Sequence, residues 1–101
     1  MSDEKIVVKI DPELEDLIPG FLNNRTKDLA TLQAALKEQN YQSIQSVGHS
    51  LKGVGGGYGF TGMSEIGAAI EKAAKERAVA DLPVLIERYG KYLNAIQVVY
   101  E

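Results

Sequence analysis

The side chains best suited to chemistry lie in one short segment, Gly48-His49-Ser50-Leu51-Lys52-Gly53. His49 is the only histidine among the 101 residues, and Lys52 follows it by three positions. Neutral imidazole is a competent nucleophile near pH 7, because the ordinary imidazole pKa of about 6.5 leaves one ring nitrogen with a free lone pair. If the segment is helical, the two side chains lie one turn apart on the same face. The spacing therefore indicates a nucleophile with a cation beside it.

Helical winding separates this segment into a polar stripe and an apolar stripe. At about 100° per residue, His49, Lys52, Gly53 and Gly56 fall within one narrow sector. The opposite sector holds the residues expected to face the core: Ile44, Val47, Leu51, Val54 and Tyr58. The same winding that buries an ordinary core stripe therefore directs the imidazole into solvent.

Glycines are the unusual feature of this segment, since six of the ten in the chain lie between residues 48 and 59. Each glycine inside a helix costs about 0.5–1 kcal/mol relative to alanine, so some other gain should offset the cluster. Gly53 and Gly56 leave backbone bare beside the imidazole, which gives a phosphoryl group or a partner protein access. Gly48 and Gly55 flank the core side and would let a neighbouring helix come close. The alternative is a glycine loop that ends a short helix and leaves His49 merely exposed.

A carboxylate on the next predicted helix is the candidate partner of the imidazole. If the two helices form an antiparallel hairpin that pivots near Phe60, His49 and Glu71 lie at equal distances from the pivot. Glu71 is then positioned to accept a hydrogen bond from Nδ1–H, which would leave the Nε2 lone pair free. Lys75, one turn further along, would add positive charge near the rim. The alternative for both residues is an ordinary solvated surface charge.

The rest of the chain predicts the helices that hold these residues. Asp11-Pro12 is typical of a helix start, and the short helix that follows should kink or restart at Pro19-Gly20. An apolar stripe then extends to about residue 39, and the His49 helix begins near Tyr41. Thr61 is the predicted cap of the next helix and Asp81 of the last, whose stripe consists of Leu82, Leu85, Tyr89, Leu93, Ile96 and Tyr100.

These elements predict an all-α fold, an antiparallel up-down four-helix bundle with a short extra N-terminal helix or arm. One domain should span residues 1–101, with the arm at 1–10 and the bundle at about 20–100. Hydrophobic residues make up 45% and charged residues 25% of the chain, which is typical of a globular domain and not of a disordered one.

Composition and charge exclude several classes of function. The net charge is −3 and no Lys/Arg run is present, which argues against nucleic acid as a partner. The chain has no cysteine, and no cluster of carboxylates surrounds His49, so neither a disulfide nor a metal site is predicted. The acidic start Met1-Ser2-Asp3-Glu4 and the absence of an apolar run of about 18 residues favour a cytoplasmic protein without a membrane segment. An initiating Met1 and the absence of linkers favour a free-standing domain, and we expect it to be a monomer.

The segment from His49-Ser50-Leu51-Lys52-Gly53 to Gly59 resembles the H-x-x-K-G-x-x-x-x-x-G signature of histidine-containing phosphotransfer (HPt) domains. Chain length, helix order, the mid-chain histidine and Glu71 also fit, so the resemblance covers most of the sequence. The departures are Val54, where the family commonly has Ser or Ala, and the glycine-rich stretch that follows it.

The resemblance implies a phosphorelay module with His49 as the phosphorylated residue. It implies that Lys52 steadies the phosphoryl oxygens, Gly53 gives steric room and Glu71 orients the imidazole, with Lys75 where some members carry a basic residue. The implied partners are a response-regulator receiver domain, a hybrid sensor histidine kinase, or both. No cofactor is implied, and Mg²⁺ would belong to the receiver.

Two other functions remain open at this point. A helical adaptor that is never phosphorylated could use the same glycine-lined surface to bind a partner. An enzyme that holds a nucleotide on the glycine run is disfavoured, because Gly53–Gly57 lacks the P-loop order G-x-x-x-x-G-K-[ST] and no strand precedes it. Autokinase activity is therefore not expected.

Overall fold

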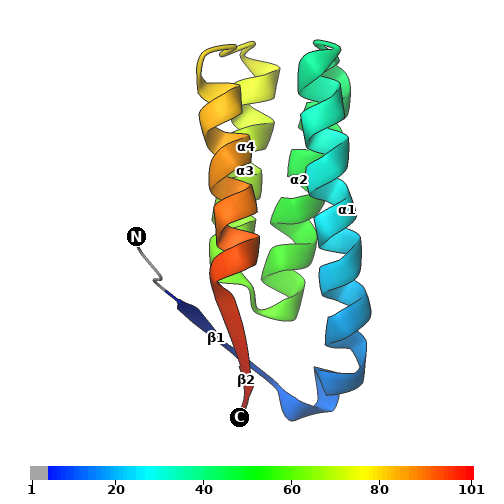
Figure 1. Ribbon diagram of the computed structural model, residues 1–101, viewed down its shortest axis with the longest axis vertical. Helices are drawn as coiled ribbons and strands as arrows, with labels where there is room; N and C mark the ends of the chain where they lie inside the picture. The colour runs from blue at the N-terminus through cyan, green and yellow to red at the C-terminus, as the bar shows by residue number, and fades with distance from the viewer. Residues whose placement is uncertain (1–4) are drawn as a thin grey trace.

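Four α-helices, one short 3₁₀ helix and two short strands make up the computed structural model, which describes residues 5–101 (Figure 1). The acidic segment 1–4, on which the expectation of a cytoplasmic protein partly depends, lies outside the described residues. In chain order the elements are β1 (Ile6–Ile10), the 3₁₀ helix η1 (Pro12–Leu17), α1 (Ile18–Lys37), α2 (Tyr41–Tyr58), α3 (Thr61–Lys75), α4 (Asp81–Ala95) and β2 (Ile96–Tyr100).

Local capping explains where the first helices begin and end. An Asp11 carboxylate oxygen accepts a 2.9 Å hydrogen bond from the Glu13 amide, with Pro12 at the first position of η1, as the sequence predicts. The predicted restart is also present, with Pro19 in the first turn of α1. The Asn40 side chain caps α2 by accepting from the Ser43 amide at 3.1 Å. Gly59 ends α2 in the left-handed conformation with φ of 92°, which glycine adopts without steric cost.

The predicted caps of the last two helices are wrong. Thr61 and Asp81 are the first helical residues of α3 and α4, and the capping positions are taken by Phe60 and Ala80, neither of which makes a side-chain cap hydrogen bond. Asp81 still lies in the first turn of α4, where a carboxylate interacts favourably with the helix dipole.

The two ends of the chain form a sheet, so the all-α prediction needs correction. Residues 6–10 are not a helix or free arm, and the last helix ends at Ala95 and does not continue to Tyr100. β1 and β2 pair in parallel, with Ile6 opposite Ile96 and Ile10 opposite Tyr100. Both segments are rich in β-branched residues, which favour strands. Val8 and Ile10 point inward from β1 and are 7% and 1% exposed, so the sheet adds to the core.

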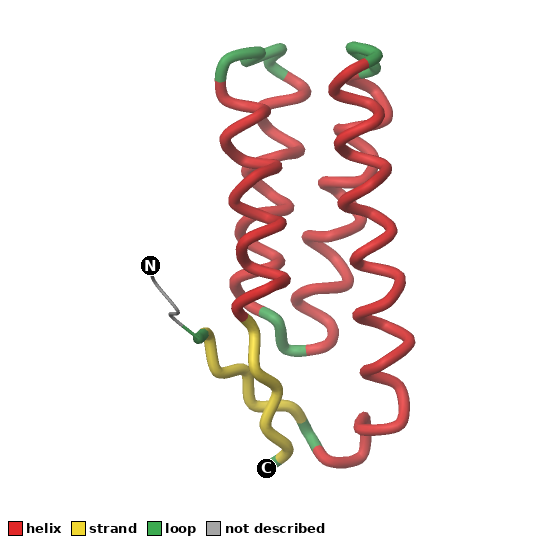
Figure 2. The backbone as a smooth tube through the Cα atoms, viewed as in Figure 1, coloured by secondary structure: helices red, strands yellow, loops and turns green. Residues whose placement is uncertain are grey.

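The helices stand side by side around a shared core (Figure 1). The α1–α2 and α3–α4 connections lie at one end of the bundle, whereas the α2–α3 turn lies at the other end, nearer to the sheet (Figure 2). The fully buried side chains at the centre include Leu32, Ile44, Leu51, Met63, Ile70, Leu82 and Tyr89. Between residues 5 and 101, none of the helices has the length and apolar character needed to cross a membrane.

Candidate functional site

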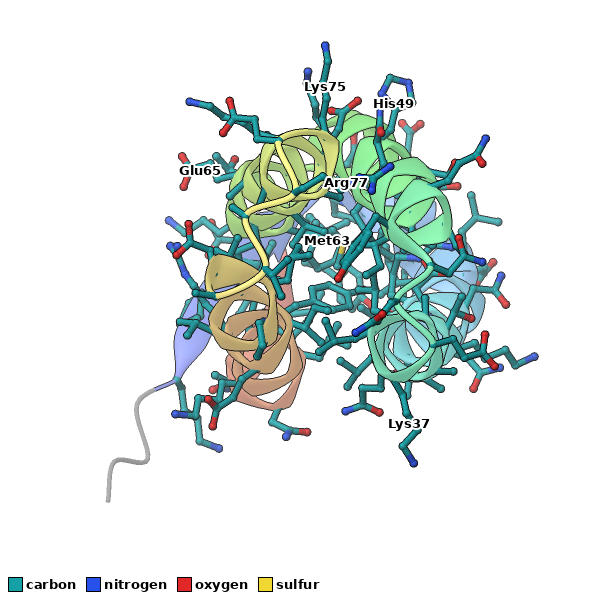
Figure 3. The ribbon with its side chains drawn as sticks, turned by 90° about the horizontal axis from the view of Figure 1, so that it is seen from above. Lys37, His49, Met63, Glu65, Lys75 and Arg77 are labelled. Carbon is teal, nitrogen blue, oxygen red and sulfur yellow. The ribbon has the colours of Figure 1, made fainter. Side chains whose placement is uncertain are left out.

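The polar stripe predicted on the histidine helix is exposed on α2. His49, Lys52, Gly53 and Gly56 face solvent, whereas Ile44 and Leu51 on the opposite side are completely buried. Seen from above, His49 projects away from the bundle while Met63 of α3 points into it (Figure 3). The segment is therefore helical through to Tyr58, and the alternative of a glycine loop that ends a short helix is wrong.

The imidazole of His49 contacts one carboxylate, that of Glu71 on α3. The distance between Nδ1 and Glu71 Oε2 is 2.9 Å, which is hydrogen-bonding distance. The His49 side chain is 73% exposed and that of Glu71 is 24% exposed. Since a carboxylate only accepts, Nδ1 carries the proton in this contact and the neutral ring keeps its lone pair on Nε2. The interaction fixes one ring nitrogen and leaves the other to solvent.

Lys52 lies on the other side of the same carboxylate. Its Nζ is 3.9 Å from Glu71 Oε1, and its side chain is 54% exposed. At this distance and exposure the ion pair is weak and the ammonium group can move toward another anion at little cost. Glu71 thus bridges the two α2 residues that the sequence singled out, one through each oxygen.

The glycines of α2 fall into two groups. A Cβ built on Gly53 would meet nothing within 4 Å, and one on Gly56 would meet only Ser64 Oγ at 3.7 Å, so the surface beside the imidazole is open. A Cβ on Gly48 would lie 2.7 Å from the Glu71 amide nitrogen, and one on Gly55 would lie 2.7 Å from the Ser64 amide nitrogen. These two glycines permit the close approach of α3, as the sequence predicts.

Lys75 is not part of the contact network around His49. It is exposed near the end of α3 and projects from the same side of the bundle as the histidine (Figure 3). Within residues 5–101 it has no ion pair within 4.0 Å. The structure brings His49, Lys52 and Glu71 together and leaves Lys75 at the periphery.

Several residues near the site were missed in the sequence. Gln42, Gln45 and Ser46 line a shallow recess together with His49 and Glu71. All three lie on the α2 face that carries the histidine, at helical spacings of three, four and seven residues, which is the signal that could have identified them.

Two more missed residues lie on α3, opposite the glycines of α2. The Ser64 hydroxyl donates a 2.8 Å hydrogen bond to the Lys52 carbonyl oxygen, and a Cβ on Gly67 would lie 2.6 Å from the Lys52 amide nitrogen. The signal for Gly67 was a glycine in the interior of a predicted helix, one turn before Glu71, where it lowers helix stability for no evident reason.

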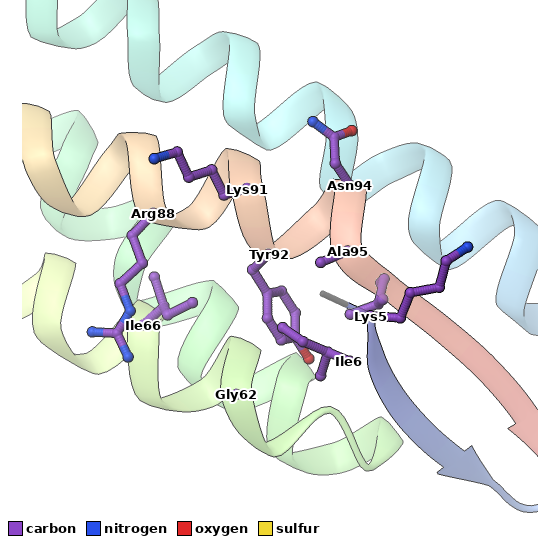
Figure 4. A pocket seen from close by; sticks show the side chains of 10 residues that line it. Lys5, Ile6, Gly62, Ile66, Arg88, Lys91, Tyr92, Asn94 and Ala95 are labelled. Atoms are coloured by element: carbon purple, nitrogen blue, oxygen red, sulfur yellow. The ribbon is translucent and has the colours of Figure 1, made fainter. Parts of the chain in front are cut away.

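A larger recess lies away from the histidine, between α3, α4 and the start of β1 (Figure 4). Its lining is apolar and basic and includes none of the predicted site residues: Lys5, Ile6, Gly62, Ile66, Arg88, Lys91, Tyr92, Asn94, Ala95 and Ile96. Its lining offers no nucleophile comparable to the imidazole of His49.

The clearest shifts in pKa also occur away from the histidine. Burial raises the pKa of Tyr89, whose hydroxyl donates to the Arg25 carbonyl oxygen at 2.8 Å. Burial also raises the pKa of Asp28, an effect that the neighbouring Arg25 guanidinium opposes. These groups connect α1 to α4 and act on stability. Within residues 5–101, no group of three or more His, Cys, Asp or Glu side chains is arranged to hold a metal ion.

A comparison with protein families identifies the chain independently of this geometry. The family model described as Hpt domain matches residues 16–98. No curated protein and no solved structure matches the chain. The match includes all four helices and most of β2, and it leaves out β1 and the beginning of η1.

Proposed function

The chain belongs to the Hpt domain family, whose function is histidine phosphotransfer in phosphorelay signalling, and on this premise we propose that His49 is the residue that carries the phosphoryl group. The observation that supports this assignment is the exposed imidazole with Nδ1 hydrogen-bonded to Glu71 at 2.9 Å. His49 is also the only histidine in the chain, so the family function has no other candidate.

The proposed reaction begins with an aspartyl phosphate on a receiver domain. The Nε2 lone pair attacks phosphorus, an N–P bond forms, and the acyl phosphate P–O bond breaks with its electron pair going to the aspartate carboxylate. No proton needs to move, because Nδ1 already carries it. The phosphorylated ring is then formally cationic, and the Glu71 carboxylate at Nδ1 offsets that charge. The reverse step passes the group on.

Lys52 has the proposed role of a mobile cation. Its Nζ rests 3.9 Å from Glu71 in this state, and a phosphoryl group on Nε2 would offer it more negative charge than one carboxylate does. Phosphoryl transfer depends mainly on alignment and charge stabilisation, and Lys52 would supply the positive charge that stabilises the phosphoryl oxygens. Gly53 and Gly56 give the donor room to approach, and Lys75 adds positive charge at the periphery.

The partners of the family are receiver domains and histidine kinases, and we propose a response-regulator receiver, a hybrid sensor kinase, or both, as the partners of this chain. We also propose that the chain works as one domain over residues 1–101, as a monomer, with its four helices in antiparallel up-down order. The position of the connections at alternate ends of the bundle supports that order (Figure 2). A cytoplasmic location, the lack of a cofactor and the lack of autokinase activity remain predictions.

The direct test is phosphotransfer from a phosphorylated receiver domain to the purified chain. The expected product is an adduct that is labile in acid and stable in alkali, and His49→Gln should abolish it. Glu65→Gln, an exposed carboxylate on the same helix as Glu71, serves as the matched control and should transfer normally. Label uptake by the His49→Gln variant would refute the assignment. A receiver that binds the wild type and His49→Ala equally, without transfer, would indicate the adaptor function.

A further inference from the structure

We infer that Gly48 of α2 and Gly67 of α3 are positioning residues, whose backbone contact sets the helix separation that keeps Glu71 against His49. The importance of that contact for signalling rests on the proposed function. The ring nitrogen of His49 that holds the proton reports on this contact, and it can be identified without any phosphotransfer.

The space normally taken by a side chain at position 48 is occupied by α3 backbone. A Cβ on Gly48 would lie 2.7 Å from the Glu71 amide nitrogen, 2.9 Å from the Gly67 carbonyl oxygen and 3.1 Å from the Glu71 Cα. Real Cβ atoms essentially never come within 3.0 Å of such neighbours. The residue that precedes the histidine is therefore in contact with the backbone of the residue that binds the histidine.

The contact is reciprocal at position 67. A Cβ there would lie 2.6 Å from the Lys52 amide nitrogen, 2.7 Å from the Leu51 Cβ and 2.8 Å from the Gly48 carbonyl oxygen. Each glycine thus occupies the place that the other leaves empty, and the backbone atoms around them belong to Lys52 and Glu71. This close approach of α2 and α3 lies directly beneath the candidate site.

One hydrogen bond also fixes the position of α3 along the axis of α2. The Ser64 hydroxyl, one turn before Gly67, donates to the Lys52 carbonyl oxygen at 2.8 Å. The absence of side chains at the glycines sets how closely the helices approach but allows them to slide, whereas a hydrogen bond depends on direction and resists sliding. Together the two features define both the spacing and the axial register of Glu71 relative to His49.

The hydrogen bond of the site is sensitive to that spacing. Ordinary contacts of a Cβ lie at 3.4–4 Å, so an alanine methyl at position 67 must displace backbone by several tenths of an ångström or more. A contact that begins at 2.9 Å ceases to be a hydrogen bond near 3.6 Å. Packed helices transmit such a displacement because interiors have little free volume.

The experiment is ¹⁵N NMR of the imidazole nitrogens in the unphosphorylated chain, at about pH 8.5, two units above the ordinary imidazole pKa. His49 is the only histidine, so its two nitrogen signals are unambiguous. The wild type should hold a larger share of the Nδ1–H tautomer than Glu71→Ala, which lacks the acceptor. Gly67→Ala should lower the ratio of Nδ1–H to Nε2–H by about two- to fivefold, which is what a surface hydrogen-bonded pair is worth. Ser64→Ala should lower it in the same direction.

Two comparisons separate positioning from a general loss of structure. Gly57→Ala is the matched control, since a Cβ there meets nothing within 4 Å, and it should leave the ratio unchanged. In a Glu71→Ala background, Gly67→Ala should have no additional effect on the ratio, because the contact it disturbs is already gone. If Gly67→Ala does not fold, the tautomer ratio of Ser64→Ala is the test of the inference. Wild-type nitrogen shifts in folded Gly67→Ala and Ser64→Ala would overturn the inference, and they would leave the role of His49 in phosphotransfer intact.

Discussion

Replacing Glu71 by alanine is the sharpest functional test of the site, because it removes the acceptor at Nδ1 without removing core volume. A hydrogen bond to a charged group is worth about 1.5–3 kcal/mol when well shielded. His49 is 73% exposed and Glu71 24% exposed, so solvent screening favours a smaller value of about 1 kcal/mol. If that energy holds the reactive tautomer and ring orientation, its loss slows transfer about fivefold.

The same reasoning predicts little change in stability. The polar contacts of Glu71 are with two exposed side chains, His49 at 2.9 Å and Lys52 at 3.9 Å. Such pairs contribute about 1 kcal/mol or less to folding, which corresponds to a few degrees in Tm for a chain of this size. Transfer and unfolding should therefore respond differently to the substitution.

The assay is rapid-quench measurement of label transfer from an excess of phosphorylated receiver, beside a thermal melt of each variant. Glu71→Gln keeps an acceptor oxygen but not the charge, so its rate should fall between those of the wild type and Glu71→Ala. Glu65→Ala on the same helix should match the wild type in both measurements. A Glu71→Ala rate within twofold of the wild type, in a folded protein, would refute the proposed orienting role.

Three further predictions concern stability. Gly57→Ala should stabilise the chain by about 0.5–1 kcal/mol, because alanine has the higher helix propensity. Gly55→Ala should destabilise it by about 1–3 kcal/mol, because its methyl group would meet α3 backbone at 2.7 Å. Chemical denaturation of both variants measures the two changes in the free energy of unfolding. Tyr89→Phe should lose about 1 kcal/mol at neutral pH with its hydrogen bond, and it should reduce the loss of stability above pH 10, which urea melts across pH would measure. Ile10→Ala should cost about 2–5 kcal/mol by thermal unfolding, since Ile10 is 1% exposed.

The sign of the alkaline effect follows from the raised pKa of Tyr89. The unfolded chain loses the tyrosine proton near the ordinary value of 10, whereas the folded chain, in which burial raises the pKa, keeps it. Stability is therefore fully present below pH 10 and declines as the pH rises above it, at up to about 1.4 kcal/mol per pH unit for one group. An alkaline decline as steep in Tyr89→Phe as in the wild type would contradict this account.

The predictions for Gly55, Gly57 and Ile10 can each be contradicted by one outcome. Equal effects of alanine at positions 55 and 57 would mean that α3 does not lie against α2 as closely as described. A negligible cost of Ile10→Ala would mean that residues 6–10 behave as the free arm that the sequence alone indicated, and not as a strand packed on the core.

Local sequence determined the helices and the orientation of the reactive residues. Winding at 3.6 residues per turn was enough to separate His49 and Lys52 from the buried Ile44 and Leu51, because the period of a helix fixes the face of each residue. The pivot near Phe60 predicted that Glu71 would lie level with His49, since both arms of a short helical hairpin rise at the same rate per residue.

Long-range pairing and helix spacing were decided only in three dimensions. Ile96–Tyr100 continues the apolar spacing of α4, and it becomes a strand because Ile6–Ile10, ninety positions earlier in the chain, offers a parallel partner over the core. Likewise, nothing local shows that Gly67 faces Gly48, since a bare backbone has no pattern that names its partner. The direction in which a side chain points follows from the period of its own helix. How closely two helices approach depends on the absence of side chains from both of them at the point of contact.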